Sequence, residues 1–165
     1  DFRASERTFH LVTQVAGRTG RGDRGGRVLI QTFNPDHPAI MAAVDHDYVG
    51  FARQELPMRR LLKYPPFSHM VRFVVRGPVE PVTAEFAAEL TRRLESSLAE
   101  AQADARILGP APAPFAKLRN LFRFQIQVQA EDIERLRAGI IEATKTLKIP
   151  DGIQWIVDID PIDML

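Results

Sequence analysis

The spacing of apolar residues changes along the first third of the chain, and each change predicts a new element. Apolar side chains recur every three or four positions between residues 4 and 16, which predicts a helix with Ser5 as its candidate N-cap. Gly17 begins a glycine-rich loop that ends this helix. Residues 27–33, RVLIQTF, have a nearly continuous apolar centre and β-branched or aromatic residues, which predicts a strand.

Two helices and a proline joint follow. Helices are predicted at residues 38–44 and 46–62, and Pro57 should kink or split the second of them. The sequence YPPF at residues 64–67 cannot be helical and indicates an extended connection, so we place a domain boundary there.

The remainder of the chain alternates strand and helix patterns. Strands are predicted at residues 69–76, 105–108, 121–129 and 153–159, and helices at residues 81–103 and 131–147. The three prolines of GPAPAP hold that stretch extended, as an edge strand or a rigid loop. The order β-α-β-β-α-β is that of a split βαβ unit, with two helices on one face of a mostly antiparallel four-stranded sheet.

Alternation within two of these strands separates core from surface. Phe122 and Phe124 belong to the apolar side of the strand at 121–129, whereas Arg123 belongs to its polar side. Trp155 alternates with apolar neighbours and is expected in the core. Asp158 and Asp160 fit the polar edge of a strand better than a pair of catalytic carboxylates.

Composition narrows the chemistry. The chain has no cysteine, and its four histidines are scattered without a metal-ligand spacing, so no metal site is expected. No apolar run is long enough for a membrane span and no signal peptide opens the sequence, so a cytoplasmic protein is expected. Because the chain does not begin with Met, we expect it to be part of a longer protein.

Charge is concentrated in two short segments of a chain whose net charge is only +1. Residues 1–34 hold six arginines against three acids, and residues 115–125 hold three basic residues and no acid. Basic segments attract phosphate through counterion release, although many are simply solvated surfaces.

The first basic segment contains the sequence QVAGRTGR at residues 14–21. If the helix ends near Gly17, Arg18 and Arg21 lie one turn apart, and Gln14 lies one turn before Arg18. Two guanidinium groups in this arrangement can bracket the oxygens of a transferring phosphoryl group. The alternative is an ordinary solvated turn. The chain has no phosphate-binding loop of the GxxxxGK[ST] type, so it cannot hold a nucleotide by itself.

The pattern Q-x-x-G-R-x-G-R resembles motif VI of superfamily 2 helicases. The longer string DFRASERTFHLVTQVAGRTGRG, with YPPF, LGPAPAP and the closing DIDP, is similar to the C-terminal part of the PriA (primosomal protein N′) family of replication-restart helicases. The resemblance covers essentially the whole chain. It implies the tail of a RecA-like helicase lobe at residues 1–36, connecting helices at 37–66 and a C-terminal domain at 67–165.

The family resemblance implies an ATP-driven 3′→5′ DNA helicase that recognises forked DNA and restarts replication by primosome assembly. Gln14, Arg18 and Arg21 would then sense the γ-phosphate of ATP bound with Mg²⁺ elsewhere in the longer protein. The zinc of this family would also be bound outside this chain. The chain alone should not hydrolyse ATP, because the Walker motifs are absent.

The resemblance further implies that the C-terminal domain, which resembles a ribosomal protein of the small subunit, binds DNA and protein partners. Expected partners are forked and single-stranded DNA, the acidic tail of single-strand-binding protein and other primosome proteins. Candidate contact residues are Lys117, Leu118, Arg119, Phe122 and Arg123, to which Arg135 and Arg137 of the second helix are added. The alternative function is a stand-alone nucleic-acid-binding module with no link to an ATPase.

Overall fold

The structure is a computed structural model that describes residues 2–19 and 27–162. It divides into two compact units, Asp1–Leu62 and Lys63–Leu165. The division falls four residues before the boundary placed after residue 66 from the sequence. Each unit has a hydrophobic cluster of its own.

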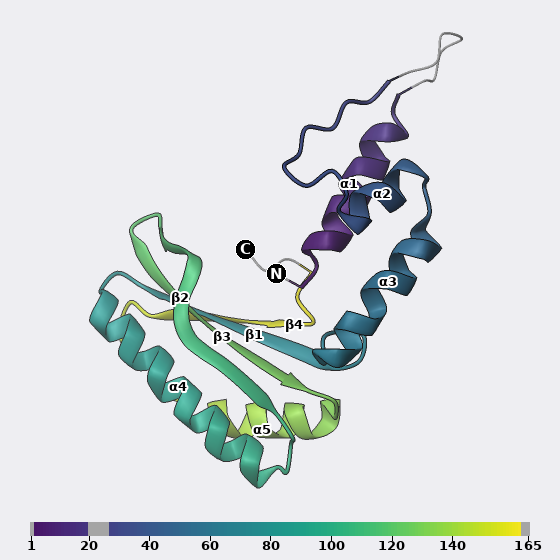
Figure 1. Ribbon diagram of the computed structural model, residues 1–165. Helices are drawn as coiled ribbons and strands as arrows, with labels where there is room; N and C mark the ends of the chain where they lie inside the picture. The colour runs from purple at the N-terminus through teal and green to yellow at the C-terminus, as the bar shows by residue number, and fades with distance from the viewer. Residues whose placement is uncertain (1, 20–26, 163–165) are drawn as a thin grey trace. The chain divides into compact units, whose positions relative to one another are not determined.

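The described part of the first unit consists of three helices, α1 (Ala4–Ala16), α2 (Pro38–Val44) and α3 (Tyr48–Leu61), as Figure 1 shows. All three were predicted from the sequence. Their core is small. Phe9 of α1 stacks on Phe51 of α3, with 4.9 Å between the ring centroids, and two alanines of α2 complete the cluster.

Local chemistry explains where these helices begin and end. The Asp47 carboxylate accepts a hydrogen bond of 2.8 Å from the Gly50 amide and so caps α3. The prediction that Ser5 caps α1 is wrong, because the helix begins at Ala4 and has no side-chain cap. Pro57 does not split α3. It removes one amide donor, while Arg59 in the next turn binds Glu55 at 3.1 Å and helps hold the helix end.

The predicted strand at residues 27–33 is not formed. These residues have no ladder partner, and Leu29 and Phe33 are almost fully exposed. A strand obtains its backbone hydrogen bonds from a neighbour, and no described residue of the first unit belongs to another strand. An apolar, β-branched sequence therefore does not become a strand here.

The second unit is a four-stranded antiparallel sheet covered by two helices on one face (Figure 1). Its elements are β1 (His69–Gly77), α4 (Glu80–Glu100), β2 (Arg106–Leu118), β3 (Leu121–Ala130), α5 (Ile133–Lys145) and β4 (Gln154–Ile159). The strand order is β2-β3-β1-β4. The split βαβ prediction and its α/β class are confirmed.

The core of this unit lies between the sheet and the helices. Alternate residues of β1, among them Phe73, are fully buried against the apolar row of α4, which includes Leu90. The ring of Trp155 in β4 stacks on Phe73, with centroids 6.2 Å apart, as expected for a core residue. The predicted apolar row of α4 is confirmed from Phe86 onward, whereas Val82 at its start is exposed.

The strand β2 is longer than the predicted 105–108, because the proline segment belongs to it. β2 is an edge strand with two irregularities in its pairing with β3, between Leu108 and Ala111 and between Pro112 and Lys117. Prolines donate no backbone hydrogen bond, so an edge position tolerates them. Gly109 has a φ of 102°, and a Cβ there would lie 2.6 Å from the carbonyl oxygen of Gln125.

Candidate nucleic-acid interface

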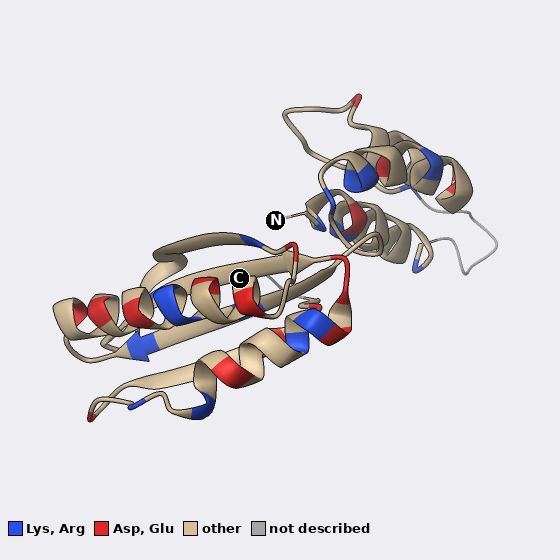
Figure 2. Cartoon of the chain, turned by 90° about the horizontal axis from the view of Figure 1, so that it is seen from below, with Lys and Arg blue, Asp and Glu red and all other residues tan. Residues whose placement is uncertain are grey.

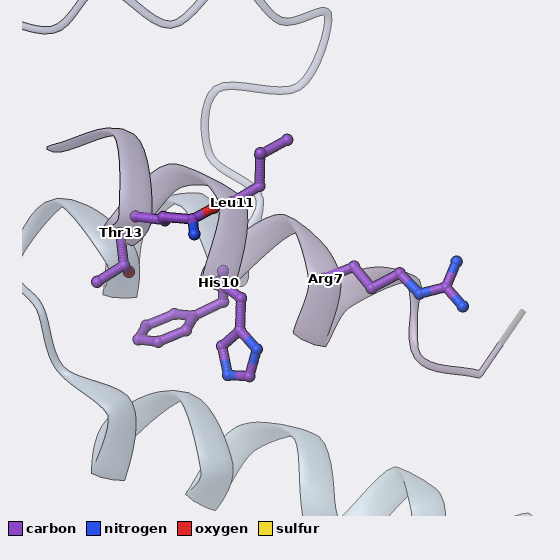
Figure 3. A pocket seen from close by; sticks show the side chains of 6 residues that line it. Arg7, His10, Leu11 and Thr13 are labelled. Atoms are coloured by element: carbon purple, nitrogen blue, oxygen red, sulfur yellow. The ribbon is translucent and has the colours of Figure 1, made fainter. Parts of the chain in front are cut away.

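The glycine- and arginine-rich segment begins in the last turn of α1. Gln14 lies within α1, and Arg18 lies just after the helix ends at Ala16 and is exposed. Arg21 lies outside the described residues. The surface of α1 is hollowed beside Gln14, with Arg7, His10 and Thr13 among the lining residues (Figure 3).

Figure 3 shows how two side chains of this hollow are oriented. The His10 ring points toward a neighbouring helix, where it stacks near Tyr48 of α3 with 6.5 Å between centroids, whereas Arg7 projects away from it. The hollow is therefore a surface of the first unit that contains one residue of the motif, Gln14. The predicted role of Arg18 and Arg21 at a γ-phosphate stays a prediction.

The second basic segment forms the hairpin between β2 and β3. Arg119 and Asn120 have φ values of 51° and 63° and connect the paired residues Leu118 and Leu121 in a two-residue turn. Both central residues of such a turn need positive φ, which Asn tolerates and Arg adopts only rarely. The turn therefore places the Arg119 side chain at the end of the sheet.

Two basic residues of the hairpin, Lys117 and Arg123, lie on opposite faces of the sheet. The ammonium of Lys117 lies 4.6 Å from the centroid of the Phe122 ring, directly across the ladder. Alternation along β3 puts Phe122 on the side of the helices and Arg123 on the opposite side, which we call the outer face. Lys117 and Phe122 thus contact each other on the helix side of the sheet, and Arg123 lies on the opposite side.

Arg119 and Arg123 meet two further arginines on the outer face. All four of these arginines line a hollow of about 210 Å³. Its full lining consists of Arg72, Val74, Arg76, Leu118, Arg119, Leu121, Arg123, Ile156 and Asp158. We call this concavity the arginine hollow. It is basic, with a partly apolar wall.

The positive charges of the arginine hollow are only partly balanced by acidic side chains. The Arg72 guanidinium donates to Asp158 at 3.3 Å, and Asp158 is the one acid in the lining. Arg76 donates to the side-chain oxygen of Gln154 at 2.9 Å, which leaves its charge unneutralised. Arg76 also lies directly opposite Arg123 in the β1–β3 register, and like charges at such positions repel. The hollow therefore carries excess positive charge.

The remaining candidates lie on the helix layer. Arg135 of α5 donates to the carbonyl oxygen of Gln102 at 2.9 Å, so it links α5 to the end of α4. Arg137 is exposed and lies 3.9 Å from Glu134 on its own helix. Neither residue lines the arginine hollow, so the structure divides the predicted contact residues among three places.

Arg72 and Arg76 are the site residues that the sequence analysis missed. A signal for them was present in the strand sequence HMVRFVVR, where arginines occupy polar positions of an otherwise apolar alternation. Asp158 and Asp160, for which a polar strand edge was predicted rather than a catalytic pair, have separate partners. Asp158 binds Arg72, whereas Asp160 accepts a hydrogen bond of 2.9 Å from the Met70 amide.

The described residues contain neither a metal-site cluster nor a membrane-spanning helix. Within residues 2–19 and 27–162, no cluster of His, Cys, Asp or Glu has the arrangement of a metal site. None of the helices in the same described ranges is both long and apolar enough to cross a bilayer.

Comparison with known proteins gives a consistent result. Residues 60–162 match the model of the primosomal protein N C-terminal domain. The chain is similar to the replication restart protein PriA of Chlamydia pneumoniae, at 36% identity over 98% of the chain and 21% of the relative. It is also similar to PriA of Treponema pallidum, at 37% identity over 100% of the chain and 25% of the relative, and to PriA of Bacillus subtilis, at 33% over 100% and 20%. The chain therefore spans about a fifth to a quarter of the length of these relatives.

Proposed function

Because the chain belongs to the PriA family of replication restart proteins and contains its C-terminal domain, we propose that it is the C-terminal part of an ATP-dependent DNA helicase. The helicase would move 3′→5′, recognise stalled or forked replication DNA, and restart replication by primosome assembly in the bacterial cytoplasm, at the nucleoid. The observation that carries this proposal is the family match over residues 60–162, together with relatives aligned along nearly the whole chain.

The first unit contributes to ATP hydrolysis in this proposal. Arg18 and Arg21 reach the γ-phosphate, and Gln14 forms a hydrogen bond in the same site. ATP and Mg²⁺ are held by parts of the longer protein that carry the Walker motifs, and zinc is bound outside this chain. The exposure of Arg18 just beyond α1 supports the proposal, because an arginine that completes a site held by another part of the same protein must project from its own unit.

Substitution of the motif arginine in the full-length protein tests this role. Arg21→Ala should lower DNA-stimulated ATP hydrolysis by about 10³-fold, the magnitude of a lost arginine finger, with binding to forked DNA retained. Arg27→Ala, outside the motif, is the matched control and should leave turnover unchanged. Normal turnover of Arg21→Ala would exclude the arginine-finger assignment, whereas a full-length protein without any ATP hydrolysis would favour the stand-alone nucleic-acid-binding module.

The second unit binds DNA and protein partners in this proposal. Its basic residues suit phosphates and also the acidic, Phe-ending tail of single-strand-binding protein; other primosome proteins are further partners. Lys117, Arg119, Phe122, Arg123 and Arg137 are the candidate contacts.

Residues 63–165 have their own core, so the unit can be examined alone. It should bind labelled forked DNA at low salt and lose most of that affinity when salt is raised fourfold, because phosphate contacts release counterions. Absence of binding at low salt would refute DNA binding by this unit.

A further inference from the structure

The sheet of the second unit has two chemically different faces. The face toward α4 and α5 is apolar and buried, as described above. The outer face carries the arginine hollow at one end, formed by Arg72, Arg76, Arg119 and Arg123. On the other side of the sheet, α4 is rich in acid: it contains five glutamates and two arginines, and Figure 2 shows the red positions along that long helix.

The charge on the outer face is not satisfied by the protein. Arg119 and Arg123 have no ion-pair partner among residues 2–19 and 27–162, and Arg76 binds only a neutral amide. Arg72 is only 8% exposed, and its Nε atom is buried without an acceptor in the same ranges. The buried Nε donor of Arg72 lacks an acceptor, and Arg76 and Arg123 repel each other across β1 and β3, so both features lower stability. A bound anion would relieve both.

The outer face carries one more exposed arginine beyond the hollow, Arg106, while Met70 and Gln129 between Arg106 and Arg76 are buried. Arg106 lies opposite Gln129 in the β2–β3 register, and Gln129 lies opposite Met70 in the β3–β1 register. Met70 is six residues before Arg76 on β1, so Arg106 and Arg76 lie about 20 Å apart along the strand direction. Outward-facing amides of β3, Gln125 and Gln127, lie between these two ends. A strip of this length suits a repeating polyanion better than a single phosphate.

Three of the four strands offer no aromatic residue on the outer face. None of the outward residues of β1, β3 and β4 is aromatic, so these strands offer no platform on which bases could stack. Guanidinium groups with flanking amides contact phosphate oxygens, which carry no sequence information. Charge complementarity and the length of the strip therefore favour the sugar–phosphate backbone as the occupant.

We infer that the outer sheet face, from the arginine hollow to Arg106, is the surface on which this unit binds the sugar–phosphate backbone of DNA, without base stacking. This inference rests on the proposed function and specifies the face that performs it. It assigns Arg72 and Arg76 to the interface together with Arg119 and Arg123, and it leaves Arg135 and Arg137 outside.

The test compares two double variants of the full chain, residues 1–165, by fluorescence anisotropy with fluorescein-labelled forked DNA. Arg76→Gln with Arg123→Gln removes two charges from the outer face. The matched control, Arg92→Gln with Lys145→Gln, removes two charges from exposed residues of α4 and α5 that pair within their own helices. Thermal unfolding should show both variants folded, because the outer-face change removes a repulsion.

The outer-face variant should bind at least about tenfold more weakly, since two charge-assisted hydrogen bonds to phosphate are lost. Its plot of log affinity against log salt should be shallower by about 1.4 to 1.8, from two fewer neutralised phosphates. The control should change by less than about threefold, and oligonucleotides of different base sequence should compete equally.

Equal losses in the two variants, or unchanged affinity of the outer-face variant, would overturn the inference while DNA binding by the unit stands. Retained DNA affinity with lost binding of an acidic peptide would assign the face to a protein tail and also overturn it. No binding by the wild-type chain would refute the DNA-binding part of the proposed function, and this inference with it.

Discussion

The two units bury their apolar side chains to very different extents. Among the residues that the structure describes, the cluster of the first unit has four buried residues, of which two are alanines, whereas that of the second has fifteen. In the first unit Leu29, Phe33 and Leu61 are strongly exposed, although apolar residues of this size usually lie inside. The difference follows from architecture, because three short helices cover little of one another, whereas a sheet offers one continuous apolar face to two helices.

The two units are therefore stabilised by different kinds of interaction. The second unit joins segments far apart in the chain through the sheet, so its core is complete within residues 63–165. The described part of the first unit holds together by a small aromatic cluster around Phe9 and Phe51 and by ion pairs, such as that of Arg59 with Glu6 at 3.0 Å. The two units should therefore respond separately to substitutions in their own cores.

The largest expected effect is the loss of a ring from the core of the second unit. Phe73→Ala should destabilise this unit by about 3 to 5 kcal/mol, because it leaves a cavity and removes the stack on Trp155. Trp155 is the only tryptophan, so its fluorescence during urea unfolding reports this unit. Phe9→Ala in the first unit should leave that transition unchanged. A single transition shifted equally by both variants would contradict independent cores.

A smaller loss of stability is expected from a substitution where α4 and α5 approach each other closely. A Cβ at Gly139 would lie 2.7 Å from Leu98 Cδ2 and 3.1 Å from its Cα. Gly139→Ala should therefore cost about 1 to 3 kcal/mol, despite the better helix propensity of alanine. Ala138→Gly, at the exposed neighbouring position, should cost only about 1 kcal/mol. Stabilisation by Gly139→Ala, measured by the same fluorescence transition, would show that the two helices can separate.

The smallest effect concerns acid sensitivity of the first unit. The hydrogen bond from Arg3, opposed by partial burial and reinforced by Arg59, holds the pKa of Glu6 below its ordinary value of 4.5. A lowered folded-state pKa contributes stability that is present above pH 4.5 and is lost as pH falls through the folded-state value. The contribution should be at most about 1 kcal/mol, because these side chains are partly exposed.

Hydrogen exchange of α1 amides between pH 6 and pH 3, corrected for intrinsic rates, measures this contribution. Protection should fall in the wild-type chain as Glu6 becomes protonated. Glu6→Gln should show lower protection than the wild type at pH 6, no such step, and similar protection at pH 3, while amides of β1 serve as the internal reference. The same step in Glu6→Gln would mean that another group is responsible.

Much of the fold followed from local patterns, because helices and alternating strands are set by neighbours in sequence. The helices α1, α2 and α5 and the strands β1, β3 and β4 agree with the patterns to within a few residues. Apart from the N-cap of α1, the predictions that failed are of strands, which depend on distant partners. Residues 27–33 have strand composition but no neighbouring strand, and β2 is longer than predicted because β3 pairs with its proline segment.

The residues of the candidate site were likewise predicted only in part from the sequence. The sequence alone determined the family, the motif Gln14–Arg21, and the basic character of the segment that contains Arg119 and Arg123. Only the tertiary structure decided that Arg72 and Arg76 join that segment while Lys117 and Arg137 do not. The physical reason is strand register: pairing Arg76 with Arg123 fixes which side chains share a face, and that pairing links residues 47 positions apart.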